Sequence, residues 1–198
     1  QNGSANYGGG IHCNSSSPNL DNVIISNNVS SDNGGGVYCY FSSPSLKNVT
    51  ISNNTATGNE GYSGGGIWYG YYSIPNLVNT IISDHTGNYG IFNWSGNPSI
   101  TNSNFYNNES GNCYNCGWVG ENVTTNANGD SCDVYYNIQK DPEFVDIDNN
   151  NYRLQNWSQL IGSGTTTNAP TTDVTAEPRR GEHDRARHAT TADAAAAA

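Results

Sequence analysis

The sequence predicts an all-β fold, in which about four coils of a parallel β-helix are followed by an irregular C-terminal segment. A run of glycines closed by an apolar residue recurs along the chain. The closing residues are Ile11, Val37, Ile67 and, in a degenerate fourth copy with a single glycine, Ile91. They lie 26, 30 and 24 positions apart. A period in this range is typical of a stack of small units, each of which contacts only its neighbours.

A second repeated phrase predicts the strands of each coil. It has the form Pro-x-Leu-x-Asn-Val-x-Ile-Ser-Asn-Asn and occupies residues 18–28, 44–54, 75–85 and 98–108. Its apolar residues alternate, as Val23 and Ile25 do, which is strand periodicity. The runs are short and are bounded by Gly, Pro, Asn and Ser, which mark turns. We therefore expect two or three strands per coil, with coils stacked at the spacing of neighbouring strands.

Asparagine recurs at the corner that ends this phrase. The pairs are Asn27-Asn28, Asn53-Asn54 and Asn107-Asn108. Side-chain amides at such positions can stack into a ladder. The third copy has Asp84 and His85 instead, so we expect the ladder to be interrupted there. This doublet is the only acid–base-like pair within the coils, and its position favours two turn residues.

These phrases resemble the right-handed parallel β-helix repeat proteins of the pectate-lyase-like superfamily. The resemblance is closest to bacterial choice-of-anchor and polymorphic outer-membrane-protein-like surface proteins. Residues 141–146 and 151–154 are similar to the segment that ends the helix in choice-of-anchor proteins. The resemblance covers residues 1–162 and implies a right-handed helix. We expect β-helix coils over 1–110, a continuation or cap over 111–162, and a low-complexity, irregular tail over 163–198.

Charge and composition exclude several classes of function. The net charge is −10, and Lys47 and Lys140 are the only basic residues before Arg153, so we expect no nucleic-acid partner. No stretch is apolar enough to span a membrane. The chain has no Met and no visible signal peptide. We therefore expect a fragment, or a mature protein whose first coil is supplied from elsewhere.

Five cysteines favour an extracellular or cell-surface location, and the chain also contains nine glycosylation sequons. Cys13 and Cys39 hold the same place in adjacent coils, where either a disulfide or two free thiols would fit. Cys113-x-x-Cys116 and Cys132 favour a local disulfide over a zinc site, because no fourth ligand lies nearby. The sequons begin at Asn2, Asn14, Asn28, Asn48, Asn53, Asn93, Asn108, Asn122 and Asn156. If the source is eukaryotic, we expect glycans on the corner asparagines.

No catalytic machinery stands out, so we assign no catalytic residue. Lyase chemistry commonly needs an Arg or Lys base, and the coils offer Lys47 alone. Hydrolysis needs carboxylates gathered on one face. The coil carboxylates are scattered over different positions: Asp21, Asp32, Glu60, Asp84 and Glu109. Asp146-x-Asp148-x-Asn150 begins like a calcium loop but then departs from it, so Ca²⁺ remains an alternative to no cofactor at all.

An aromatic cluster is the best candidate binding site. It consists of Trp68, Tyr69, Tyr71 and Tyr72. Not all four can point inward, so we expect some to form an exposed patch for sugars or a partner, or else a cap over a local bulge. The favoured function is an extracellular structural scaffold that self-associates or pairs with neighbouring coils, in filaments, surface arrays or adhesion. The alternative is a polysaccharide-binding or polysaccharide-degrading protein.

Overall fold

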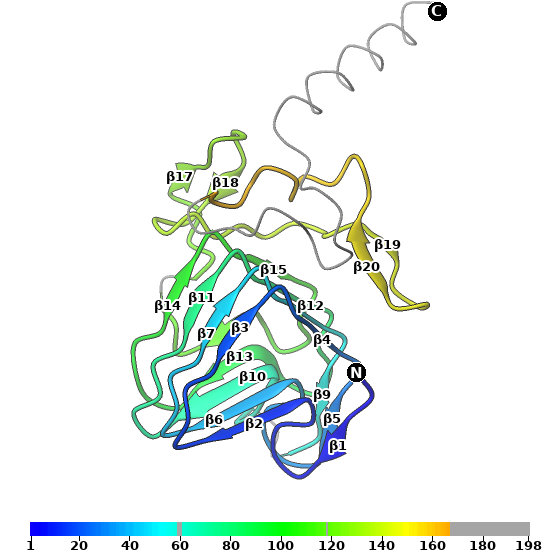
Figure 1. The fold of residues 1–198 in the computed structure, drawn as a ribbon. Coiled ribbons are helices and arrows are strands. Elements are labelled where there is room, and N and C mark those ends of the chain that lie inside the picture. Colours follow the sequence, from blue (N-terminus) through cyan, green and yellow to red (C-terminus); the bar gives the residue numbers. More distant parts are fainter. Residues whose placement is uncertain (59–60, 118, 167–198) are drawn as a thin grey trace, which may run out of the picture.

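The computed structural model describes residues 1–58, 61–117 and 119–166, which form a parallel β-solenoid of about four coils (Figure 1). The described residues contain strands and turns and no helix, so the predicted all-β class is confirmed. Accordingly, these residues hold no helix long and apolar enough to cross a membrane. Most of the predicted tail, residues 167–198, lies outside the described residues.

Four parallel sheets run from coil to coil (Figure 1). The five-stranded sheet contains β2 (Ile11–Asn14), β6 (Val37–Tyr40), β10 (Gly64–Gly70), β13 (Tyr89–Asn93) and β16 (Cys113–Tyr114). One four-stranded sheet contains β3 (Asn19–Asp21), β7 (Ser45–Lys47), β11 (Asn76–Val78) and β14 (Ser99–Thr101). The other contains β4 (Ile24–Ser26), β8 (Thr50–Ser52), β12 (Ile81–Ser83) and β15 (Asn104–Tyr106). The shortest contains β1 (Ser4–Ala5), β5 (Val29–Ser30) and β9 (Thr55–Ala56).

The core consists of columns of equivalent apolar residues. The strand register places Ile11, Val37, Ile67 and Ile91 above one another. A second column contains Leu20, Leu46, Leu77 and Ile100. A third contains Ile25, Ile51, Ile82 and Phe105. Most of these side chains are fully buried in one cluster. The period read from the sequence therefore corresponds to one coil of the solenoid.

The asparagine ladder lies inside the solenoid and extends to His85 in the third coil. Asn54 Oδ1 accepts a hydrogen bond from the backbone N–H of Asn28, and His85 Nδ1 accepts the equivalent bond from Asn54 N–H, at 3.0 and 3.1 Å. His85 therefore takes part in the ladder, and the interruption falls after it: no side-chain hydrogen bond among the described residues joins His85 to Asn108, whose Oδ1 is buried without a partner. An unprotonated imidazole Nδ1 presents a lone pair where Asn presents its amide oxygen. Asp84 faces outward at the corner and accepts from Asn107 Nδ2 at 2.9 Å.

The glycine runs pass between the coils where backbones approach closely. A Cβ on Gly36 would lie 2.7 Å from the carbonyl oxygen of Gly66 and 3.1 Å from Asn54 Nδ2. Any larger residue would separate the coils or push on the ladder. The repeated glycines therefore maintain the coil spacing.

The C-terminal segment covers one end of the solenoid and returns along its side (Figure 1). Phe105 N–H donates to Ile138 O, and Ser103 N–H donates to Asn137 Oδ1, both at 3.0 Å. Two antiparallel pairs follow the coils: β17 (Thr124–Thr125) with β18 (Ser131–Cys132), and β19 (Phe144–Asp146) with β20 (Asn151–Leu154). The second pair reaches the first coil, where Asn27 Nδ2 donates to the Tyr152 hydroxyl at 3.2 Å.

The cysteines divide into one bonded pair and three buried thiols. The sulfur atoms of Cys113 and Cys116 lie 1.98 Å apart, which is disulfide distance. Cys13 and Cys39 are register partners in the core, as the sequence predicts, and they are present as free thiols. The hydrogen bond with Cys13, together with burial, raises the pKa of the Cys39 thiol. Cys132 packs with Ile138 and Leu160.

Candidate functional site: an aromatic face

The four clustered aromatics of the third coil take three different positions. Tyr69 points into the core and is fully buried, with its hydroxyl 3.7 Å from Cys116 Sγ. Trp68 points outward but is only 4% exposed, because neighbouring rings cover it. Tyr71 and Tyr72 follow in the turn and are 43% and 84% exposed. The predicted patch therefore keeps Tyr71 and Tyr72, with Trp68 beneath them, and loses Tyr69.

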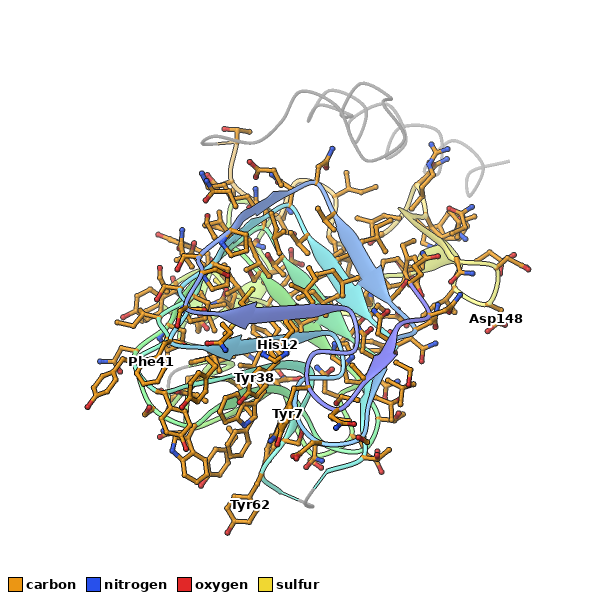
Figure 2. All side chains as sticks on the ribbon, turned by 60° about the horizontal axis from the view of Figure 1, so that its bottom comes forward. Tyr7, His12, Tyr38, Phe41, Tyr62 and Asp148 are labelled. Atoms are coloured by element: carbon orange, nitrogen blue, oxygen red, sulfur yellow. A yellow bond between two sulfur atoms is a disulfide. The ribbon has the colours of Figure 1, made fainter. Side chains whose placement is uncertain are left out.

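Trp68 belongs to an outward column of rings on the five-stranded sheet. The register places His12, Tyr38, Trp68, Phe92 and Tyr114 in one row across its five strands. Rings from the neighbouring positions and turns surround this column. Together they form what we call the aromatic face: Tyr7, His12, Tyr38, Tyr40, Phe41, Tyr62, Trp68, Tyr71, Tyr72, Tyr89, Phe92, Trp94 and Tyr114. Figure 2 shows the labelled Tyr7, His12, Tyr38, Phe41 and Tyr62 on one side of the solenoid, away from Asp148.

Ring stacking between coils holds the column together. Tyr38 stacks on Trp68 with 4.6 Å between ring centroids and an interplanar angle of 10°. Phe92 stacks on Tyr114 at 4.6 Å and 2°. His12 meets Tyr38 edge to face at 5.1 Å. Such pairs contribute about 0.5–1.5 kcal/mol beyond the area they bury. The inner part of the face therefore stabilises the stack of coils.

The exposed rim of the face includes rings held in an unusual backbone conformation. Phe41, Tyr71 and Tyr72 have φ values of 48°, 53° and 63°. This left-handed region costs roughly 1–2 kcal/mol for a bulky residue. Other corners of the coils place small polar residues there, for example Ser15, Asn22 and Asp84. Strain of this kind at exposed residues points toward a function for the rings.

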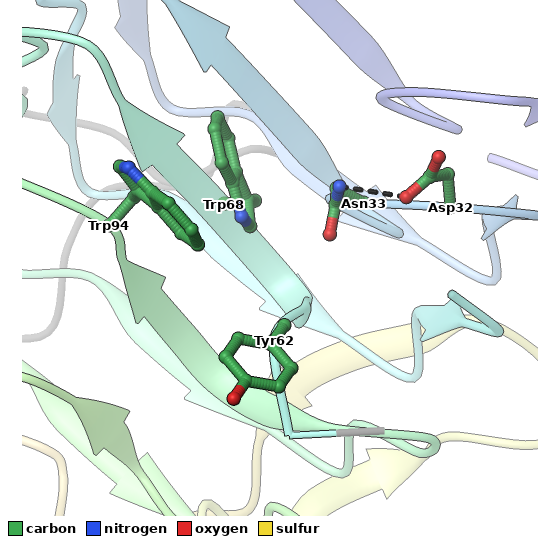
Figure 3. A pocket seen from close by; sticks show the side chains of 5 residues that line it. All are labelled: Asp32, Asn33, Tyr62, Trp68 and Trp94. Carbon is green, nitrogen blue, oxygen red and sulfur yellow. Dashed lines mark hydrogen bonds between the residues drawn. The ribbon is translucent and has the colours of Figure 1, made fainter. Parts of the chain in front are cut away.

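A pocket of about 330 Å³ opens on the face (Figure 3). Its lining residues are Asp32, Asn33, Tyr62, Trp68 and Trp94. Asn33 Nδ2 donates to Asp32 Oδ1 at 2.8 Å, which fixes the two polar groups relative to each other. Gly70 gives the two indoles room, because a Cβ there would lie 2.8 Å from Trp94 Cβ and 2.9 Å from Trp68 Cη2. The pocket therefore combines aromatic walls with a polar end formed by Asp32 and Asn33.

The electrostatics of the face are acidic. Burial raises the pKa of Tyr38 to about 12, and the neighbouring Tyr7, Tyr40, Tyr71 and Asp32 act in the same direction. A hydrogen bond to the Asp32 carboxylate raises the pKa of Tyr7. Within the described residues, the only Lys and Arg side chains are Lys47, Lys140 and Arg153. None of the three belongs to the five-stranded sheet or lines the pocket.

Comparison with known proteins does not identify a family for this chain. Comparison with models of protein families, with curated proteins and with solved structures finds no match.

The sequons divide by burial. The side chains of Asn28, Asn93 and Asn108 are 1%, 1% and 9% exposed, so they cannot carry a glycan in the folded protein. Asn93, for example, donates to the carbonyls of Gly96 and Asn115 at 3.0 and 2.9 Å. Five others are exposed and one is partly exposed: Asn2, Asn14, Asn53, Asn122 and Asn156, and then Asn48. Glycosylation at these six stays a prediction.

The remaining candidate sites show structural roles. Asp146 accepts hydrogen bonds from Asn149, and Asn150 Oδ1 accepts from Asn27 Nδ2, so the calcium-like loop forms a turn that contacts the first coil. The described residues contain no group of three or more His, Cys, Asp and Glu placed to hold a metal. Burial lowers the pKa of His85 to about 4, and its Nε2 has no partner among the described residues. Within the ladder, His85 acts as a hydrogen-bond acceptor.

The sequence contained a signal for the wider face. The residue directly after each closing Ile or Val is His12, Tyr38, Trp68 or Phe92. A ring therefore occurs at this position in every copy, although its identity changes each time. Tyr7 and Tyr62 join the face from segments that precede the strands, and no repeat position marks them in advance.

Proposed function

We propose that the protein binds carbohydrate through the aromatic face, with the solenoid serving as a rigid scaffold. The observation that carries this proposal is the exposed rim of rings on one sheet. Phe41, Tyr62, Tyr71, Tyr72 and Trp94 are 43–84% exposed around a buried, stacked column. A cluster of exposed rings on one side of a protein marks an interaction surface.

Sugar is the ligand class that the chemistry of this rim favours. A pyranose has an apolar C–H face that packs on a ring and in-plane hydroxyls that need donors and acceptors. The face offers both kinds of partner, since Asp32 and Asn33 line the same pocket as Trp94. Among the described residues that line the pocket, Asp32 is the only carboxylate, whereas hydrolysis uses a pair. Binding without cleavage is therefore the function we favour.

The test is a glycan array probed with the full chain and with two alanine variants. Tyr72→Ala removes the most exposed ring of the face and should weaken binding several-fold. Trp157→Ala removes a ring that is 69% exposed in the C-terminal segment and is the matched control. Wild type that binds no glycan would overturn the proposal. Release of shorter products from a bound polymer would support the degrading enzyme instead.

A second candidate function is assembly through strand edges. β1, β2, β3 and β4 are the outermost strands of their sheets, and Ile11, Leu20 and Val23 are only partly buried at this end. Unpaired strand edges invite pairing with another coil, from this chain or a second copy. We propose such pairing as the basis of an extracellular array, in keeping with the resemblance to pectate-lyase-like surface proteins. Strictly monomeric sedimentation at high concentration would contradict self-association.

A further inference from the structure

The pocket on the aromatic face has two walls of different chemistry. Tyr62 and Trp94 are 57% and 52% exposed, so their ring surfaces are open to a ligand. Asp32 and Asn33 form the polar end and are joined by a hydrogen bond, and the Asp32 carboxylate also accepts from the Tyr7 hydroxyl. Asn33 Oδ1, one Asn33 N–H and the remaining lone pairs of the carboxylate face a ligand. Figure 3 shows the two indoles on one side of this space and the two polar residues on the other. Its volume, about 330 Å³, is near the lower end of small-ligand pockets, about 300–1,000 Å³.

A buried donor at the wall of the pocket lacks an acceptor. Trp68 is 96% buried, since 4% of its surface is exposed, and its Nε1 has no hydrogen-bond partner among the described residues. In Figure 3 this nitrogen lies on the ring edge nearer Asn33 and Tyr62. Buried polar groups are nearly always hydrogen-bonded, so an unpaired indole N–H points to a missing partner. Because Trp68 lines the pocket, a ligand oxygen bound there is the candidate acceptor.

Charge decides which sugars fit. Asp32 places a carboxylate at the polar end, and the described residues that line the pocket include no Lys or Arg to neutralise a second one. A uronic acid would set its carboxylate near that of Asp32, and like charges in a partly buried site repel strongly. A hexose offers hydroxyls in the same place, which can donate to Asp32 in charge-assisted hydrogen bonds.

We propose that this pocket, formed by Asp32, Asn33, Tyr62, Trp68 and Trp94, binds one uncharged hexopyranose unit and discriminates against uronic acids. The ring packs between Tyr62 and Trp94, its hydroxyls bond Asp32 and Asn33, and one hydroxyl accepts from Trp68 Nε1. This inference rests on the proposed carbohydrate-binding function and assigns its selectivity to one site. The remaining rings of the face extend the contact along the glycan.

Isothermal titration of the full chain tests this selectivity. The probes are gluco-, manno- and galacto-oligosaccharides and an oligogalacturonate of matched length. At least one neutral oligosaccharide should bind about tenfold or more tightly than the oligogalacturonate. Equal or tighter binding of the oligogalacturonate would overturn the assignment. Asp32→Asn should reduce this discrimination, and an unchanged ratio would also contradict it.

Three further variants locate the site. Trp94→Ala should weaken binding of the neutral oligosaccharide about tenfold, and Asn33→Ala about fivefold, while Trp157→Ala should bind as wild type does. Circular dichroism verifies that each variant keeps the fold. If Tyr72→Ala weakens binding but Trp94→Ala and Asn33→Ala do not, the pocket is wrong and the carbohydrate-binding face stands. If wild type binds no glycan, the proposed function fails, and the pocket fails with it.

Discussion

Two columns of stacked side chains run from coil to coil, one inside the solenoid and one outside. The inner column, Asn28, Asn54, His85 and Asn108, is buried, and its bonds go to particular backbone groups. The outer column, from His12 to Tyr114, is held by ring stacking. The inner column accepts only residues that present a hydrogen-bond acceptor at one point. The outer column tolerates any ring, so the type of ring in each coil can vary with the partner that the face contacts.

The largest effect should follow from breaking the inner column. Asn54→Ala removes the acceptor of Asn28 N–H and leaves the carbonyls of Ile25 and Ser52 without their side-chain donor. Each lost bond to a buried group costs about 1–3 kcal/mol. We expect the free energy of unfolding to fall by about 4 kcal/mol in urea titrations, whereas the exposed control Asn14→Ala should change it by less than about 0.5 kcal/mol. Similar losses for both variants would show that the ladder is not a special source of stability.

The inner column should also make stability depend on pH. Burial holds the pKa of His85 at about 4 in the folded protein, below its ordinary value of 6.5. The unfolded chain therefore takes up a proton between pH 6.5 and 4 that the folded chain does not, so stability falls as the pH falls through this range. The loss attributable to His85 should be on the order of 3 kcal/mol.

His85→Asn is the matched test of this pH dependence. It restores the residue found in the other coils, and Asn does not titrate. Unfolding free energies measured from pH 7 to pH 4 should fall less steeply in the variant by this amount. Parallel curves for the two proteins would contradict the prediction, because they would show that protonation of His85 does not change the free energy of unfolding.

The smallest effect should come from the outer rim and should have the opposite sign. Tyr72→Asn removes a bulky residue from a left-handed conformation at 84% exposure, so little packing is lost. We expect the free energy of unfolding to rise by about 0.5–1 kcal/mol in thermal or urea titrations, while glycan binding falls. Tyr72→Phe keeps both the ring and the strain and should leave stability unchanged. A destabilised Tyr72→Asn would mean that the ring supports the turn.

The fold could be predicted because every repeat places apolar residues at the same positions. Val23 and Ile25 recur as Val49 and Ile51 at the same places in the phrase, each pair separated by one residue, so the inward side of one coil indicates the inward side of the next. The adjacency of Cys13 and Cys39 followed from the same register. The role of His85 could not be predicted from its residue type. The sequence identifies a titratable side chain, but only the structure shows that its Nδ1 takes the place of an asparagine amide oxygen. The extent of the aromatic face was hidden for another reason, since Tyr62 approaches Phe92 only once the coils are stacked.

The contact between Asn27 and the β19–β20 pair joins residues that are more than 120 positions apart in the chain. An ideal solenoid unfolds piecemeal, because each unit interacts only with its neighbours. Here the first coil cannot fray without releasing a hairpin that belongs to the far end of the described chain. The contact couples the two ends, so the first coil should fray less than the end coil of an ideal solenoid, and the contact should form late in folding because its loop is long.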